Sequence, residues 1–295
     1  CHTAPMGSAA DWTNATPRQM FGHVLRPEQL LERATYGSAE PHPELSGWIE
    51  RYWSVTWDLD PDEVVRTSTL DEPSVHLTRE RGGARRIGTD GPGAWVTGPV
   101  TRGRFDVDLT GQGDVIGVKF KIGGFLAVID PERLELRGLR DSTTPASDWF
   151  PDGGPPAELP AGARDAAPAL DSWLLGLEPR EPPGYAAFHH VLEILGEPSV
   201  TTLAALEART GLTARSLQRL LDRFAGVSPK RMLIRARVND ALSLLDRGDQ
   251  RPLTDIAHAL GWYDQSHFIR DFRAITGQSP SAYRQRARPS GRDIR

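Results

Sequence analysis

Two stretches of this 295-residue sequence decide its fold: GLTARSLQRLLDRFAGVSP at residues 211–229, and GWYDQSHFIRDFRAITGQSP at residues 261–280. They align when one residue is inserted in the second stretch, with a spacing of 50 residues before the insertion and 51 after it. Self-similarity at a fixed spacing is the signature of a repeated structural unit. Each copy therefore predicts a short helix, a glycine turn and a second helix, which together form a helix-turn-helix unit.

The turn of each unit is predicted from its glycine and from the polar residue that follows. A tight turn between helices commonly needs a residue with positive φ, which favours Gly211 and Gly261. Thr213 and Asp264 then occupy the positions where a side-chain oxygen accepts from the first N–H groups of the second helix. A longer helix over 229–247 is predicted to connect the two units.

The second helix of each unit divides into an apolar face and a polar face. Leu217 and Phe224 in the first copy, and Phe268 and Phe272 in the second, are spaced as core residues. Arginine recognises guanine with two hydrogen bonds and glutamine recognises adenine, so the polar faces favour DNA. The polar face of the first copy carries Arg215, Gln218, Arg219 and Asp222, and that of the second carries Ser266, Ile269, Arg270 and Arg273, flanked by Gln265 and His267.

For either helix alone, a solvated charged face is the simpler interpretation. Arg219 and Arg270 occupy the same repeat position, however, and the presence of both favours recognition of DNA. Asp222 and Asp271 are expected to pair with neighbouring arginines, since a carboxylate near phosphate is repelled.

The charge is distributed unevenly along the chain. The whole sequence has a formal net charge of −4, which by itself argues against a nucleic-acid partner. Residues 186–295, however, contain 17 Lys and Arg against 11 Asp and Glu, a net +6, and the rest of the chain carries −10. A basic C-terminal third beside an acidic larger part favours a polyanion partner for the basic part.

This C-terminal region resembles the DNA-binding domain of the AraC/XylS family of bacterial transcriptional regulators, over about residues 199–286. The resemblance is carried by GLTARSLQRL and GVSPKRM in the first copy, by the connecting helix, and by LTDIAHALGWYDQSHFIRDFRAITGQSPSAYR in the second. It implies two recognition helices in successive major-groove segments on one face of double-stranded DNA. The implied base-reading residues are Arg215, Gln218, Arg219, Gln265, Ser266, His267 and Arg270, and the implied phosphate contacts are Thr213, Ser228, Lys230, Arg273 and Ser279.

The N-terminal half follows a period of two between about residues 45 and 122. Trp53, Val55 and Trp57 are expected on one face of a strand, with Tyr52 on the other. Short strands separated by Gly and Pro clusters predict a β-barrel or sandwich. This half resembles, more weakly, the cupin-like barrel of AraC-type sensor domains, which implies binding of a small-molecule effector or formation of a homodimer. The candidate pocket residues are Trp53, Trp57 and Trp95, and the alternative is that they are only core.

The sequence thus predicts an α+β protein in four segments. Residues 1–20 are expected to be a disordered tail or a cloning remnant, and residues 21–145 a β-rich effector or dimerisation domain. Residues 146–184 are expected to be a Pro-rich connection with a short helix near 169–177, and residues 185–295 the double helix-turn-helix domain.

Several classes of protein are excluded or disfavoured. The longest apolar run, Phe125–Ile129, is far shorter than the roughly 20 residues of a membrane-spanning helix. A single cysteine, Cys1, allows no internal disulfide and fits a reducing cytoplasm. His23, His42 and His76 are scattered, so we expect no metal, no cofactor and no catalytic residues.

The expected function is transcription regulation, with RNA polymerase as the implied protein partner. Activation is the expected outcome, and the sequence by itself does not distinguish it from repression. Two alternatives remain open from the sequence. One is a constitutive architectural DNA-binding protein whose β domain only dimerises, and the other is an N-terminal enzyme tethered to DNA.

Overall fold

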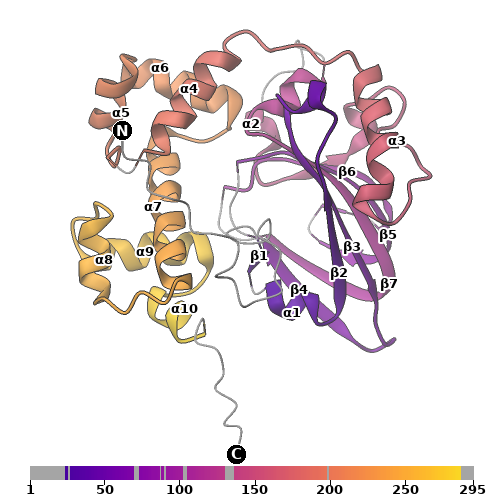
Figure 1. The fold of residues 1–295 in the computed structure, drawn as a ribbon, viewed down its shortest axis with the longest axis horizontal. Helices are drawn as coiled ribbons and strands as arrows, with labels where there is room; N and C mark the ends of the chain where they lie inside the picture. Colours follow the sequence, from indigo (N-terminus) through magenta and orange to yellow (C-terminus); the bar gives the residue numbers. More distant parts are fainter. Residues whose placement is uncertain are drawn as a thin grey trace, which may run out of the picture.

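The computed structural model describes residues 24–25, 27–69, 73–86, 88–89, 91–101, 105–129, 136–197 and 199–286. The tail predicted to be disordered lies outside these residues. Figure 1 shows a sheet lobe beside a column of helices that runs from α4–α6 at one end to α8–α10 at the other. Within the described ranges, every helix is too short or too polar to cross a membrane.

The sheet lobe is built around one long strand, β7 (Phe105–Phe120). Strand β5 pairs with it along one side, while β4 and β3 share its other side end to end. All the pairings are antiparallel, which agrees with the predicted alternation of short strands and turns. The other strands are β1 (Val24–Leu25), β2 (Ala34–Ala39), β3 (Ile49–Asp58), β4 (Val64–Thr69), β5 (His76–Arg85), β6 (Gly93–Thr97) and β8 (Thr143–Pro145).

The expected closed barrel is wrong for the described strands. They form an open sheet in the order β1-β4-β7-β5-β6-β8, with β3 and β2 following β7 on a second branch. The sheet branches because β7 is long enough to pair with two strands on one side. The edge strands are therefore β1, β2 and the three-residue β8, and these do not pair with one another to close a barrel. The relation to cupins stays a prediction.

The two faces of β3 have different environments, as the alternation predicts. Tyr52 and Ser54 point to the face covered by α3 (Ala163–Gly176), where the Tyr52 hydroxyl donates to Asp171 Oδ1 at 2.6 Å and the Ala163 N–H donates to Ser54 Oγ at 3.0 Å. Trp53, Val55 and Trp57 lie on the opposite face, in a separate cluster of apolar side chains.

Helix α3 is longer than the helix expected in the Pro-rich segment, and it covers the sheet instead of crossing between domains. Pro168 lies inside it, where the missing N–H costs one hydrogen bond. Burial of the apolar face against β2 and β3 compensates for that loss. The buried residues of this helix are Ala163, Ala166, Ala167, Leu170 and Leu174.

The helical column contains the two predicted units. The first is α5 (Leu203–Thr210) and α6 (Ala214–Phe224), the second is α8 (Leu253–Ala259) and α9 (Gln265–Thr276), and α7 (Pro229–Asp246) connects them. Helices α4 (Tyr185–Leu195) and α10 (Pro280–Arg286) flank the column. The short helices of the sheet lobe are α1 (Pro27–Leu31), α2 (Leu136–Leu139), η3 (Pro43–Leu45), η4 (Gly124–Ala127) and η6 (Ala146–Asp148).

The predicted turn geometry is confirmed in both units. Gly211 has φ 68° and Gly261 has φ 82°. Thr213 Oγ1 accepts from the Ser216 N–H at 3.3 Å, and Asp264 Oδ1 accepts from the His267 N–H at 2.8 Å. Local sequence therefore determines where α6 and α9 begin.

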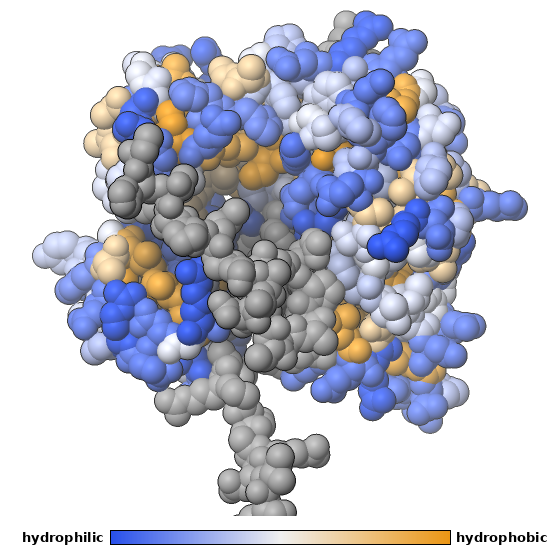
Figure 2. Space-filling model, viewed as in Figure 1, coloured by the Kyte–Doolittle hydropathy of each residue, from blue (hydrophilic) through white to orange (hydrophobic). Residues whose placement is uncertain are grey.

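The two units belong to different hydrophobic cores. Phe224 at the end of α6 stacks on Phe188 of α4, with ring centroids 4.9 Å apart, in the same cluster as the sheet residues that face α3. Arg140, which follows α2, donates to the Gly226 carbonyl at 3.2 Å. The second unit has its own cluster around Phe268 and Phe272. Figure 2 shows hydrophobic residues along the hollow between the upper helices and the sheet lobe.

The two turn glycines offer a matched test of this architecture. A side chain at positive φ costs about 1–2 kcal/mol of stability. A Cβ at Gly211 would meet open space, whereas one at Gly261 would lie 2.9 Å from Thr201 Cβ. We expect Gly211→Ala to lower the free energy of unfolding only by the cost of the backbone conformation. Gly261→Ala should lower it clearly more, and urea unfolding measures both changes. Equal losses would contradict the close approach of Thr201 to this turn.

Candidate nucleic-acid interface and ligand cavity

Helix α6 presents its polar face to solvent. Arg215 and Arg219 are exposed, while Gln218 is half-buried and donates to Asp222 Oδ2 at 2.8 Å. An N–H group at the N-terminus of the helix is satisfied inside the unit, because a side-chain oxygen of Glu207 in α5 accepts from the Ala214 N–H at 2.6 Å. The two arginines are therefore available to a partner, and Gln218 is held by an internal bond.

Helix α9 presents a similar face. Ser266, His267 and Arg270 are exposed. Gln265 is half-buried and accepts from Thr254 Oγ1 at 2.8 Å, and His267 Nδ1 lies 2.7 Å from Asp264 Oδ2. The backbone hydrogen bond from His267, together with its side-chain bond, lowers the pKa of Asp264 below the ordinary value of an aspartate.

One exposed aromatic residue of this region was not among the sequence-based candidates. Tyr263 lies in the turn before α9 and is 90% exposed, whereas the adjacent Trp262 is buried. The repeat aligns the two turns but does not predict exposure at the position next to the inserted residue. A large exposed ring beside the N-terminus of a recognition helix makes Tyr263 a candidate contact.

The expected phosphate contacts lie at helix ends and on exposed surfaces. Ser228 and Ser279 accept from the Arg231 and Ala282 N–H groups at 3.3 and 3.2 Å, so both cap helices. Thr213 also caps a helix, as described above. Lys230 and Arg273 are exposed.

The hydrogen-bond partners of the two aspartates of the recognition helices are not arginines, although the charge of Asp271 also acts on Arg237 and opposes the lowering of its pKa by burial. Asp222 accepts from Gln218, and Asp271 Oδ2 accepts from Trp262 Nε1 at 2.9 Å. Neutral donors one turn away, or across the unit, replace the arginines, which leaves the guanidinium groups of Arg219 and Arg270 pointing outward.

The fold and this surface define a class: a DNA-binding protein with two helix-turn-helix units on one connecting helix. A helix-turn-helix domain family matches residues 206–286, and a family described as a domain of unknown function, DUF6597, matches residues 38–142. The C-terminal domain is thus of the type found in the AraC/XylS family of transcriptional regulators.

Individual relatives resemble the same domain. The transcriptional activator RhaS of Pectobacterium carotovorum is 37% identical over 83 residues, which are 28% of this chain and 29% of RhaS. The match thus spans less than a third of the length of this curated relative. A probable AraC family regulator from Rhodopseudomonas palustris is 32% identical with a TM-score of 0.30, over 35% of this chain and 94% of that one. The DNA-binding domain of AdpA, solved with a target DNA, is 28% identical with a TM-score of 0.30, over 38% and 100%.

A cavity of about 170 Å³ lies in the sheet lobe, on the face of β3 opposite α3. Trp53 and Trp57 form part of its wall because each packs over a glycine of β7: a Cβ at Gly117 would lie 2.1 Å from the Trp53 ring, and one at Gly113 would lie 2.3 Å from the Trp57 ring. The apolar wall also includes Tyr36, Val55, Phe105 and Leu109. The third expected residue, Trp95, is buried outside this wall, with its Nε1 donating to the Gly91 carbonyl at 3.2 Å.

A buried ion pair lies in the cavity wall, beside other polar residues that include Arg51 and His76. Glu80 and Arg86 are 4% and 5% exposed and contact each other directly. Thr78 Oγ1 donates to Glu80 Oε1 at 2.8 Å, and Arg86 Nη1 donates to Thr97 Oγ1 at 2.5 Å. Burial lowers the pKa of Arg86, and the charge of Glu80 opposes that shift.

Neither member of this pair was among the sequence-based candidates. The period of two in β5 (His76–Arg85) could have placed Thr78 and Glu80 together, because residues two apart in a strand share one face, here the face toward the cavity. Arg86, however, follows the strand, and only the tertiary structure brings it back to Glu80.

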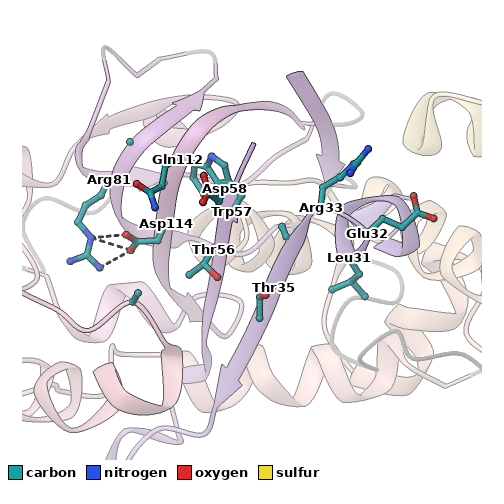
Figure 3. A pocket seen from close by; sticks show the side chains of 14 residues that line it. Leu31, Glu32, Arg33, Thr35, Thr56, Trp57, Asp58, Arg81, Gln112 and Asp114 are labelled. Atoms are coloured by element: carbon teal, nitrogen blue, oxygen red, sulfur yellow. Dashed lines mark hydrogen bonds and ion pairs between the residues drawn. The ribbon is translucent and has the colours of Figure 1, made fainter. Parts of the chain in front are cut away.

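A second hollow is open and polar. Figure 3 shows Arg81 of β5 beside Asp114 of β7, in a groove of about 750 Å³. Two nitrogens of Arg81 contact this carboxylate at 2.6–3.0 Å, while Nη1 donates to the Leu159 carbonyl at 2.7 Å. These bonds fasten the chain that leads into α3. In the described part of the chain, no three His, Cys, Asp or Glu side chains are grouped to hold a metal ion.

The ion pair predicts a non-additive response to mutation. Removing one partner of a buried pair costs about 3–5 kcal/mol, because an uncompensated charge remains buried. We expect Glu80→Leu and Arg86→Leu each to lower the free energy of unfolding by that amount, and the double variant to lose less than either single one. Urea unfolding of the three variants checks this. Additive losses would contradict direct coupling of the two charges.

Proposed function

We propose that this protein is a sequence-specific regulator of transcription that places α6 and α9 in successive major-groove segments on one face of double-stranded DNA. The observation that carries the proposal is the pair of outward-facing arginines, Arg219 and Arg270, at equivalent positions of two helix-turn-helix units. The net positive charge of residues 186–295 supports it. Phosphate contacts supply most of the affinity, and the recognition helices supply the specificity.

The roles of the side chains follow from their chemistry. Arg215, Arg219 and Arg270 suit guanine, because each presents a fork of N–H donors to its O6 and N7. Gln218 and Gln265 suit adenine, and each must first exchange its internal hydrogen bond for one to the base. Ser266 and His267 lie in the first turn of α9, where recognition helices commonly contact base edges. We include Tyr263 as a contact beside that turn.

The sheet lobe is proposed to bind a small-molecule effector in the cavity beside Trp53 and Trp57, and to regulate DNA binding through the shared core. A homodimer and contact with RNA polymerase complete the proposal. The description of RhaS as an activator supports activation as the outcome. A lobe that only dimerises would bind no ligand.

Base recognition predicts a loss confined to specific DNA. Arg219→Ala and Arg270→Ala each lose about 1–3 kcal/mol of specific binding, because a bidentate contact to a base is removed. Sites selected from random DNA supply the probe, and gel shifts at fixed salt measure the change. Arg247→Ala is the matched control, since Arg247 is an exposed arginine beyond the end of α7 and away from both recognition helices. Unchanged affinity in both test variants, with folding intact, would contradict the assignment.

A phosphate contact predicts a different response. Lys230 lies in the first turn of α7 and is exposed. Replacing it with alanine should weaken binding equally for specific and unrelated DNA and reduce the slope of log K against log salt by about one. Salt titrations of wild type and Lys230→Ala measure that slope. A loss restricted to one DNA sequence would assign Lys230 to base recognition instead.

A further inference from the structure

The cavity in the sheet lobe has a wall of mixed chemistry that narrows the kind of ligand it suits. The following inference rests on the proposed effector site and concerns its occupant. Aromatic and aliphatic side chains make up more than half of the wall. The polar residues include Arg51, His76 and several hydroxyl side chains, and the most deeply buried charges among them are the ion pair of Glu80 with Arg86.

The ion pair is incompletely bonded on one side. Glu80 Oε1 contacts Thr78 and Arg86, but Oε2 has no hydrogen-bond partner among the described residues, although the side chain is 4% exposed. A buried polar atom without a partner is costly, and such atoms in native proteins usually mark a missing ligand, water or ion. Oε2 is an acceptor, so the missing group is a hydrogen-bond donor.

A second polar atom of the wall is also without a partner in the described part of the chain. Trp53 Nε1 is a buried donor without an acceptor there, and it lies against Gly117 of β7. The Thr67 hydroxyl of the same wall is likewise without a partner among the described residues. A hydroxyl or amino group on a ligand can donate to Glu80 and also accept from a donor of the wall.

The size and shape of the cavity limit the rest of the ligand. A cavity of about 150 Å³ lined by apolar residues holds one benzene molecule, and this one has about 170 Å³. The rings of Trp53, Trp57 and Phe105 offer edges and faces for aromatic contacts, which contribute beyond simple burial. The apolar part of the ligand is therefore the size of a single ring.

We propose that the sheet-lobe cavity binds a single-ring aromatic compound that carries a hydroxyl or amino group, with that group donating to Glu80 Oε2. A carboxylate in place of that group disfavours binding, because Glu80 repels it. Neither guanidinium of the wall is free to offset the repulsion: that of Arg86 bonds Glu80, Thr78 and Thr97, and that of Arg51 bonds Glu50. A ring without a donor leaves Oε2 unpaired.

The first test uses the full chain without DNA and four probes that differ at one substituent: phenol, aniline, toluene and benzoate. Isothermal titration calorimetry measures binding, and tryptophan fluorescence provides a second readout through Trp53 and Trp57. We expect phenol and aniline to bind at least about tenfold more tightly than toluene, as a hydrogen bond to a charged group provides. Benzoate should bind more weakly than phenol. Equal affinity for phenol and toluene, or no binding of phenol, would overturn the proposal.

Variants then locate the site. Ala84 is buried in the cavity wall, so Ala84→Phe fills the space and should abolish phenol binding. Val64 is 59% exposed on β4, so Val64→Phe is the matched control and should bind phenol as wild type does. Circular dichroism verifies that each variant is folded, and the probe series on wild type decides the question if Ala84→Phe does not fold. Undiminished phenol binding by folded Ala84→Phe would place the ligand elsewhere and overturn the assignment.

The donor contact is tested separately with Glu80→Gln, which keeps the size of the side chain. The preference for phenol over toluene should fall towards one, and a retained preference would exclude Glu80 as the acceptor. None of these measurements includes DNA. Failure of ligand binding thus leaves DNA recognition untouched, and failure of the gel shifts leaves the ligand result intact.

Discussion

The contact on which the rest of this structure depends is the aromatic stack of Phe188 and Phe224. Phe224 ends the first recognition helix, and a Cβ at Gly123 of the sheet lobe would lie 3.1 Å from it. Tyr185 closes the same cluster and donates from its hydroxyl to the Gly47 carbonyl at 3.2 Å. Through these rings the first helix-turn-helix unit and the sheet lobe share one core. The end of β7 and α6 are therefore joined by packed side chains.

The second unit stands apart from that core. Its cluster is built from α7, α8 and α9, and the stack of Arg237 over Trp262 at 4.7 Å joins the connecting helix to the turn. The position of α9 relative to the sheet lobe is consequently set by α7 and by the approach of Thr201, just before α5, to the Gly261 turn. The first recognition helix packs in the core shared with the sheet lobe, and the second is joined to that core through the 18-residue α7 and this contact. The two units are repeats of one another, but only the first shares a hydrophobic core with the sheet lobe.

One face of the sheet is sealed by packing, and the other borders the cavity. The face that bears Tyr52 is sealed by α3 and continues into the first unit, so it cannot open without disrupting the core. The opposite face keeps its space because Gly113 and Gly117 let two tryptophans lie flat against β7. Glu80 and Arg86 neutralise each other there, which makes a buried carboxylate tolerable beside apolar rings. The cavity thus borders one face of the sheet, and the core that continues into the helical column borders the other.

Local patterns in the sequence determined the parts of this protein whose physics is local. The repeat, Gly211 and Gly261, and the caps Thr213 and Asp264 set both helix-turn-helix units, because helix ends depend on φ and on nearby acceptors. The outward direction of Arg219 and Arg270 followed from helical spacing, and the two faces of β3 from a period of two.

Only the tertiary structure decided the rest. The open edges of the sheet, the docking of α3 across a Pro-rich segment and the exclusion of Trp95 from the cavity depend on packing between distant residues. Sequence spacing did not predict the hydrogen bond between Gln218 and Asp222 or the ion pair of Glu80 with Arg86. Spacing predicts the face on which a side chain lies but not the neighbour to which it bonds. The core shared by Phe224 and the sheet lobe is the clearest case, since nothing in the order of residues shows which domain an apolar helix end will bury itself against.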